Sequence, residues 1–539
     1  MTTAKLSTHE HWNVFDANCV VGRHLKLRPG GLHTADDLEA EMDHFGIAEA
    51  LIVDSLSREN HPADGNARIL DVTAERPRLH PGWAALPHGP ADEQVPGEAF
   101  VAEMRRHRVG AVYLYPAQYA FGLADWSVDH FLEPLAAAGV PVFINYSAVN
   151  RGGMGQDLTD WNAVVDLCRR WPGLPVIVSE FRIRSTNRTL YRALDACENL
   201  RIELSGCWLH HCVEFITRGW GAGRLIFGSD WPTLGQGPTL ATLTAAEIGD
   251  DDKRSIAGDN LRNLIAWCEP EHPSVELPPP SDDYVAFGRS GRRPPEMTFL
   301  DNHGHLGGHS ASYHLPDCDP DAIVAEMDRL GSRKVCAFAF PGIHSDEQFG
   351  NDVTAEAVRR YPDRFVGFVT LNPHRGEEDM IRELQRGEAM GLRGIKLIPH
   401  YQGYPDDGPL IDVPCRWAHE HRWIILNHSW GGAEQMERLV STYTQACFFT
   451  GHATDLYADV MKRYANLFVC SCPLHTPRAC EHMVEAFGAD RLMFGSDLQD
   501  LPIAWGLGPI LFARLPVEQK QRILGGNLAR VLEQYSLPT

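Results

Sequence analysis

The chain lacks an excess of positive charge. Its 539 residues carry 49 Lys and Arg against 71 Asp and Glu, a formal net charge of −22. Proteins that bind nucleic acid or an anionic membrane need a basic face, so this balance argues against both partners. The remaining composition, 44% hydrophobic and 22% charged, is ordinary for a globular protein.

Long apolar runs are also absent, and so is the regular cysteine spacing of a disulfide framework. No run approaches the roughly 18 apolar residues that predict a membrane-spanning helix. The first residues, MTTAKLSTHEHWNVFDANC, do not have the basic and then apolar pattern of a signal peptide. The 13 cysteines are odd in number and irregularly spaced, which in a chain of this length indicates reduced thiols. We therefore expect a cytoplasmic protein.

The two halves of the sequence resemble each other. The motif AEMD at Ala40–Asp43 recurs at Ala325–Asp328, and RLIFGSD at Arg224–Asp230 is matched by RLMFGSD at Arg491–Asp497. The order of the matched motifs is preserved while their offset drifts from 285 to 267 residues, as changes in loop length would produce. A repeat this long indicates a duplicated domain and not a solenoid.

Each half alternates eight short β-branched runs with amphipathic stretches of helical period. The runs are NVFDANC, EALIVDS, LHPGWAAL, GAVYLYP, PVFINYS, PVIVSEF, LRIELSG and RLIFGSD, then TFLDNHG, KVCAFAF, RFVGFVTL, GIKLIP, WIILNHS, CFFTGHA, NLFVCSC and RLMFGSD. An open doubly wound sheet is the alternative, but its glycine-rich phosphate loop is missing. The sequence therefore predicts two tandem (β/α)₈ barrels of TIM type, residues 1–268 and 297–539, with an extended Pro-rich linker at 269–296.

Metal-competent side chains end several predicted strands of the second half. His303 and His305 end the first strand, His428 the fifth, His452 the sixth and Asp497 the eighth. Functional side chains of such barrels gather at the C-terminal strand ends, and residues i and i+2 of a strand share a face. We predict one divalent metal ion per chain, held by His303, His305, His428 and Asp497. Zn²⁺ suits these donors best, and Mn²⁺, Fe²⁺ or Co²⁺ also suit them.

The strand ends carry the motifs Asp301-x-His303-x-His305, Gly394-Ile395-Lys396-Leu397, Asn427-His428, Gly451-His452 and Phe494-Gly495-Ser496-Asp497. Taken together, these motifs resemble those of the amidohydrolase superfamily. Within it they most resemble the branch typified by aminocarboxymuconate-semialdehyde decarboxylase, which includes non-oxidative decarboxylases, lactone hydrolases and C–C bond hydrolases.

The resemblance implies a catalytic set of His452, Asp497 and Lys396. His452 matches the residue that activates the metal-bound water, and Asp497 matches a ligand that can also move a proton. Lys396 would neutralise an anionic substrate or an oxyanion, although a buried lysine paired with a core carboxylate is the alternative. We interpret Cys470 and Cys472 as small barrel residues, because no second cysteine pair lies at zinc spacing.

The first half has lost most of this set. Alignment of the repeats places Asn18, Val20, Tyr146, Glu180 and Tyr113 where the second half has His303, His305, His428, His452 and Lys396. Only Asp230 survives, and we expect it to hydrogen-bond the strand ends of a degenerate barrel that holds no metal. Members of the branch commonly pair barrels, so we expect intrachain pairing of the two barrels, or a homo-oligomer.

These observations leave three functions open. The leading one is a metal-dependent hydrolase that acts on a small carboxylated or cyclic substrate through a metal-activated water. The second is a metal-dependent non-oxidative decarboxylase, which would use the same residues. The third, a non-catalytic metal-binding scaffold, is the weakest because the second half keeps a full set of ligands.

Overall fold

The computed structural model describes residues 12–25, 30–87, 89–90, 93–148, 158–180 and 183–537. The chain divides into two compact units. Unit 1 comprises Met1–Trp208 and Cys212–Arg292, and unit 2 comprises Leu209–His211 and Arg293–Thr539. Residues 1–11, which include most of the N-terminal stretch checked for a signal peptide, lie outside the described residues, as does Phe181 at the end of one predicted strand.

Unit 1 contains an eight-stranded parallel sheet in the order β1 to β8. Its strands are β1 (Val14–Val21), β2 (Ile47–Asp54), β3 (Leu79–Ala84), β4 (Ala111–Leu114), β5 (Val142–Ile144), β6 (Val176–Val178), β7 (Leu200–Glu203) and β8 (Leu225–Ile226). The Ala17 amide donates to the Phe227 carbonyl at 3.0 Å, and the Val20 amide donates to the Trp231 carbonyl at 2.8 Å. These bonds join the end of β8 to β1 and close the barrel.

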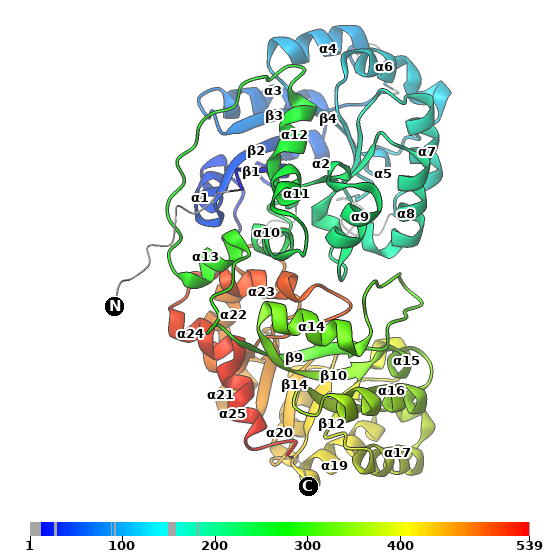
Figure 1. The fold of residues 1–539 in the computed structure, drawn as a ribbon, viewed down its shortest axis with the longest axis vertical. Coiled ribbons are helices and arrows are strands. Elements are labelled where there is room, and N and C mark those ends of the chain that lie inside the picture. Colours follow the sequence, from blue (N-terminus) through cyan, green and yellow to red (C-terminus); the bar gives the residue numbers. More distant parts are fainter. Residues whose placement is uncertain are drawn as a thin grey trace. The chain divides into compact units, whose positions relative to one another are not determined.

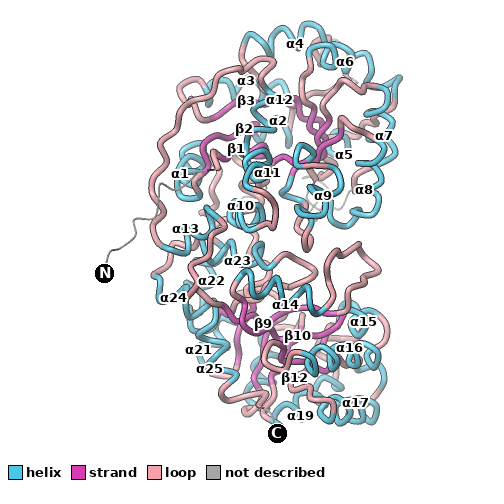
Figure 2. The backbone as a smooth tube through the Cα atoms, viewed as in Figure 1, coloured by secondary structure: helices cyan, strands magenta, loops and turns pink. Residues whose placement is uncertain are grey.

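Helices follow the strands of unit 1 and lie outside them (Figures 1 and 2). They are α1 (Ala35–Phe45), α2 (Ser55–Glu59), α3 (Pro62–Thr73), α4 (Gly97–Arg106), α5 (Pro116–Tyr119), α6 (Asp125–Ala138), α7 (Trp161–Arg170), α8 (Asn187–Ala196), α9 (Cys212–Trp220), α10 (Gln236–Ala245), α11 (Asp250–Arg254), α12 (Asn260–Ile265) and α13 (Asp283–Ser290).

Unit 2 repeats this architecture with β9 to β16 in sequential order. Its strands are β9 (Phe299–Leu306), β10 (Ser332–Ala339), β11 (Phe365–Thr370), β12 (Gly394–Leu397), β13 (Ile424–Asn427), β14 (Cys447–Thr450), β15 (Leu467–Cys470) and β16 (Leu492–Met493). The Asn302 amide donates to the Phe494 carbonyl at 2.9 Å, and the Asp497 amide to the His303 carbonyl at 2.9 Å. The predicted pair of (β/α)₈ barrels is confirmed.

The helices of unit 2 surround its strands in the same way (Figure 1). They are α14 (Pro320–Leu330), α15 (Phe340–His344), α16 (Glu347–Arg360), α17 (Glu377–Ala389), α18 (Pro399–Gln402), α19 (Asp412–His421), α20 (Ala433–Thr442), α21 (Ala458–Arg463), α22 (Ala479–Phe487), α23 (Ile503–Leu511), α24 (Val517–Gln521) and α25 (Asn527–Leu532).

The repeated FGSD motif explains how each barrel closes. In unit 1 the buried Asp16 carboxylate accepts hydrogen bonds from the Ser229 amide, at 2.9 Å, and from its hydroxyl. In unit 2 Asp301 accepts the same two bonds from Ser496, with the amide at 3.0 Å. Because each bond joins the first strand to the turn after the eighth, both copies of the motif have a structural reason to persist.

The segment after the first barrel differs from the expected extended linker. Residues 283–290 form α13, whose Tyr284, Val285 and Phe287 side chains are buried. Asp282 caps its N-terminus and Gly291 its C-terminus, the latter with a φ of +70°. The surrounding prolines favour an extended segment, but the stretch between them has capping residues at both ends and an apolar face, and it forms a short helix.

All thirteen cysteines have free thiols in the structure, and twelve of them are buried. Within the part of the chain that the structure describes, none of the helices combines the length and apolar character that a membrane crossing requires.

Candidate metal centre

Three of the predicted ligands meet at the C-terminal strand ends of unit 2. His303 and His305 lie on β9 and point to the same face, while Asp497 follows β16 in a left-handed turn with a φ of +59°. Asp497 Oδ1 lies 2.7 Å from His305 Nε2 and 3.3 Å from His303 Nε2. One donor atom from each residue falls within 4.8 Å of the other two, the arrangement that a single ion requires.

His428 and His452 lie beside this group. The His428 ring follows β13, and its centre is 5.6 Å from that of His303. His452 follows β14, with its ring centre 4.4 Å from that of His428 and 6.1 Å from that of His303. The ring centre of His400, a residue on α18, lies 5.2 Å from that of His428, with the two rings tilted by 31°.

Several buried ring nitrogens of this group make no hydrogen bond. His303 Nε2 and both ring nitrogens of His428 are buried and make no hydrogen bond. Buried polar groups in proteins are normally paired, so buried imidazole nitrogens without a hydrogen bond suit a divalent cation. A neutral imidazole and an ionised carboxylate are the forms that bind metal.

The electrostatics favour those forms. Burial lowers the pKa of His303 and of His428 well below the ordinary value, so both rings are neutral. Burial also acts to raise the pKa of Asp497, but the imidazoles of His303 and His305 outweigh it and hold that pKa well below its usual range.

Lys396 is fully buried on β12 and is not paired with a core carboxylate. Its Nζ makes no hydrogen bond and lies 4.2 Å from the centre of the Phe338 ring. Burial lowers the pKa of Lys396 to about 7, although the nearby Asp497 opposes this shift. The amine can therefore exchange a proton near neutral pH.

Cys472, which the sequence analysis interprets as a small barrel residue, also lies near this group. It lies two residues beyond the end of β15 and is buried, at 1% exposure. Donor atoms of His452, Cys472 and Asp497 all fall within 4.8 Å of one another. The sequence signal for this position is the C-x-C spacing of Cys470 and Cys472 at a strand end, which is the same as the H-x-H spacing of His303 and His305 on β9.

Unit 1 has no equivalent donor set among its described strand ends. Asn18, at the position of His303, donates to Ser179 Oγ and Glu203 Oε2, both at 3.0 Å. The expectation that Asp230 hydrogen-bonds the strand ends is wrong. Its Oδ1 is buried without a hydrogen bond, 3.9 Å from Arg58 Nη1, so a guanidinium supplies the nearby positive charge.

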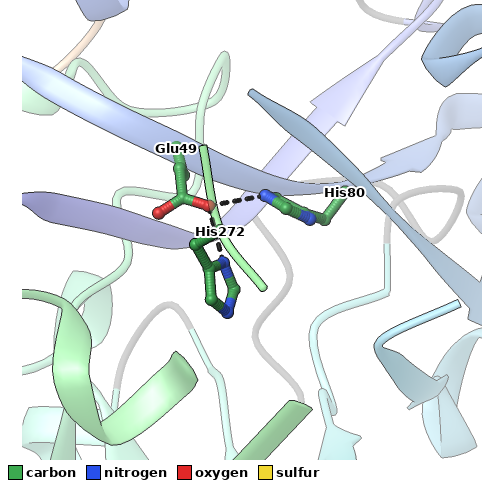
Figure 3. Close-up of side chains that lie close together, drawn as sticks. All are labelled: Glu49, His80 and His272. Carbon is green, nitrogen blue, oxygen red and sulfur yellow. Dashed lines mark hydrogen bonds and ion pairs between the residues drawn. The ribbon is translucent and has the colours of Figure 1, made fainter. Parts of the chain in front are cut away.

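A second cluster in unit 1 could not be found from sequence spacing. Glu49 at the start of β2 accepts from His80 Nε2 of β3 at 2.8 Å and from His272 Nδ1 at 2.7 Å, both on Oε2 (Figure 3). Arg262 binds the other oxygen through Nε at 2.9 Å and Nη2 at 2.7 Å. The carboxylate is thus fully hydrogen-bonded, and the cluster fixes His272 to the N-terminal end of the barrel.

The fold and the strand-end cluster define a class, the (β/α)₈ barrels with candidate metal ligands at the C-terminal ends of their strands. The chain belongs to the amidohydrolase family, whose profile matches residues 29–264 and 301–534. Both halves therefore carry the family signature, and the resemblance and the duplication inferred from sequence are confirmed. None of the curated proteins searched matches the chain.

Solved structures similar to this chain include three enzymes. One is 2,6-dihydroxybenzoate decarboxylase from Rhizobium, at 14% identity and a TM-score of 0.35, over 44% of this chain and 98% of that chain. The second, 5-carboxyvanillate decarboxylase LigW from Sphingomonas paucimobilis, has 15% identity, a TM-score of 0.35 and coverage of 44% and 100%. The third, 4-oxalomesaconate hydratase LigJ from Rhodopseudomonas palustris, has 16% identity, a TM-score of 0.35 and coverage of 44% and 96%.

Proposed function

We propose that unit 2 is a metal-dependent hydrolase for a small carboxylated or cyclic substrate, with one divalent ion held by His303, His305, His428 and Asp497. The observation that carries this proposal is the convergence of His303, His305 and Asp497 on one point, with donor atoms within 4.8 Å. A divalent ion there supplies Lewis acidity and lowers the pKa of water from about 15.7 to about 7.

The protein's own groups have separate tasks in this reaction. His452 lies beside the ligand set and is the group that takes a proton from the attacking water. Burial lowers the pKa of His452, which keeps the ring neutral and able to accept that proton. Lys396 neutralises the substrate carboxylate or the oxyanion, because its buried amine makes no hydrogen bond within the described chain.

Non-oxidative decarboxylation is the alternative, and Lys396 favours it specifically. An acid with a pKa of about 7 beside the site can deliver the proton that replaces carbon dioxide on the substrate carbon. In that reaction the C–C bond to the carboxylate breaks, its electron pair remains on carbon, and the proton from Lys396 forms the new C–H bond.

Isotope labelling separates the two reactions. The zinc-loaded full chain is incubated in ¹⁸O-labelled water with a panel of small lactones and hydroxylated aromatic carboxylic acids. Hydrolysis places one solvent oxygen in the product, whereas decarboxylation releases carbon dioxide and adds none. Chelation abolishes either activity.

The same assay tests His452. We expect His452→Gln to lower kcat by about 10²–10⁴-fold, the usual contribution of a general base, while the metal content stays unchanged. The exposed His482 on α22 offers a matched control, and His482→Ala keeps the wild-type rate. If His452→Gln is as active as the control, the assigned role is wrong; if no substrate is turned over while metal is bound, unit 2 is a scaffold.

A further inference from the structure

A guanidinium group lies at the C-terminal strand ends of unit 1. Arg58, on α2, is buried at 8% exposure. Its Nη2 donates to the Ser147 carbonyl beyond β5 at 3.2 Å, and its Nη1 lies 3.9 Å from Asp230 Oδ1 beyond β8. The corresponding strands of unit 2, β13 and β16, lead into His428 and Asp497. The Arg58 cation therefore lies between the ends of two strands whose counterparts carry two of the proposed metal ligands.

Comparison of the two repeats shows that the fold does not require this cation. Helix α2 (Ser55–Glu59) corresponds to α15 (Phe340–His344) at the offset of 285 residues, which places Ile343 at the position of Arg58. Ile343 is buried in the apolar core cluster of unit 2, at 1% exposure. A buried charge is unfavourable unless ion pairs and hydrogen bonds compensate it. Unit 1 thus has a charged side chain at a position where the same architecture accepts an apolar one.

The described groups around Arg58 compensate its charge only in part. Arg58 Nε is buried and makes no hydrogen bond, and the same is true of Asp230 Oδ1. The 3.9 Å between Arg58 Nη1 and Asp230 Oδ1 exceeds the length of a hydrogen bond. The Tyr115 ring centre lies 5.4 Å from the guanidinium carbon, a cation–π contact that uses no N–H group. A donor and an acceptor of opposite charge therefore remain available to a ligand at one place.

We propose that the strand ends of unit 1 bind a small carboxylate that carries a hydroxyl or ammonium group on the neighbouring carbon. The ligand carboxylate accepts charge-assisted hydrogen bonds from Arg58, and the neighbouring group donates to Asp230. The guanidinium supplies in unit 1 the positive charge that the proposed ion would supply in unit 2, so the anion is recognised without a metal. Unit 1 is then a ligand-binding domain, and this inference does not depend on the function proposed for unit 2.

Three probes of similar size test the ligand class on the metal-stripped full chain. Lactate carries a hydroxyl group beside its carboxylate, alanine carries an ammonium group, and propionate carries neither. Saturation-transfer NMR titrations measure the dissociation constant of each probe. We expect lactate or alanine to bind at least about 10-fold more tightly than propionate, because the additional hydrogen bond has a charged acceptor. The tighter of the two identifies the donor that Asp230 prefers.

Variants then assign the binding to these residues. Arg58→Ile gives unit 1 the residue of unit 2 and should weaken binding of the tighter probe by at least about 10-fold. Asp230→Ala should abolish the preference over propionate. The matched control Arg192→Met removes an exposed arginine of α8 in the same unit and should leave all three dissociation constants unchanged.

Three results would overturn the inference: no binding of any probe, equal binding of all three, or a preference that survives Arg58→Ile. The last result would place the probes elsewhere in the chain, for example beside Lys396 of unit 2. If Arg58→Ile does not fold, Arg58→Lys keeps the charge without the planar guanidinium and should still weaken the tighter probe. Because the protein contains no metal in these titrations, failure of the function proposed for unit 2 does not alter their outcome.

Discussion

At the scale of single residues, the surroundings of Lys396 favour a functional role for this lysine over a structural one. The lysine is fully buried, and its amine has no hydrogen bond and no ion pair with a core carboxylate. A buried amine without a partner costs stability, so a purely structural lysine at this place would be unfavourable. A bound substrate anion, as proposed above, would compensate that cost.

We therefore expect Lys396→Met to impair catalysis without destabilising the fold. A hydrogen bond to a charged group contributes about 1.5–3 kcal/mol, so kcat/KM should fall by roughly 10- to 100-fold. Steady-state kinetics of the wild type and of Lys396→Met measure the effect on catalysis, and thermal unfolding of the same two proteins measures the effect on stability. Loss of stability with unchanged kinetics would make Lys396 a structural residue.

The same variant changes how stability depends on pH. Lys396 has a pKa of about 7 in the folded protein against an ordinary value of 10.5, so between these values only the unfolded chain binds its proton. Stability of the metal-stripped wild type should therefore rise with pH across this window, by about 1.4 kcal/mol per pH unit from this group. In Lys396→Met that contribution is absent, and urea unfolding at pH 7, 8 and 9 measures the difference.

At the scale of elements, the cluster around Glu49 ties the chain after the first barrel to strands β2 and β3. Burial alone would raise the pKa of Glu49, but His272, His80 and Arg262 outweigh it and keep the carboxylate ionised. His272 is 192 residues from His80, so its hydrogen bond fixes a segment that otherwise has few anchors.

We expect His272→Ala to destabilise unit 1 by about 1–3 kcal/mol, the cost of leaving a buried polar group short of a partner. Glu276→Ala changes an exposed residue of the same segment and should alter stability by less than about 0.5 kcal/mol. Denaturant unfolding followed by circular dichroism compares the two variants. Equal effects would mean that the cluster does not anchor this segment.

At the scale of the whole molecule, duplication has preserved the barrel and not the site. Both units keep the Asp–Ser pair that joins the first strand to the turn after the eighth. Unit 1 has replaced the two β9 imidazoles with Asn18 and Val20, and Asn18 has become part of a hydrogen-bond network. Both units therefore keep the residues that join the first strand to the turn after the eighth, whereas unit 1 lacks the candidate metal ligands of β9.

One divalent ion per chain is the resulting prediction. His303→Asn combined with His305→Val gives unit 2 the residues of unit 1, and this variant should retain no ion after dialysis because one carboxylate and one imidazole remain. His80→Ala, which alters the cluster of unit 1, should still hold one ion. Elemental analysis measures both, and two ions per wild-type chain would contradict the prediction.

The sequence alone determined the architecture and the first candidate metal ligands. Strand and helix periodicity, the repeated FGSD motif and the H-x-H spacing are local patterns, and they sufficed for two eight-stranded barrels and for His303, His305 and Asp497 at the strand ends. Helix α13 was missed because its local signals lay among prolines.

Only the tertiary structure decided which distant side chains meet. Glu49, His80 and His272 share no spacing motif, and the spacing of Cys472 does not predict that its sulfur lies within 4.8 Å of donor atoms of His452 and Asp497. The physical reason is that closure of a barrel gathers its strand starts into a ring at one opening and its strand ends into a ring at the other. A side chain's neighbours there depend on strand register and on the turn after each strand, which no short stretch of sequence encodes.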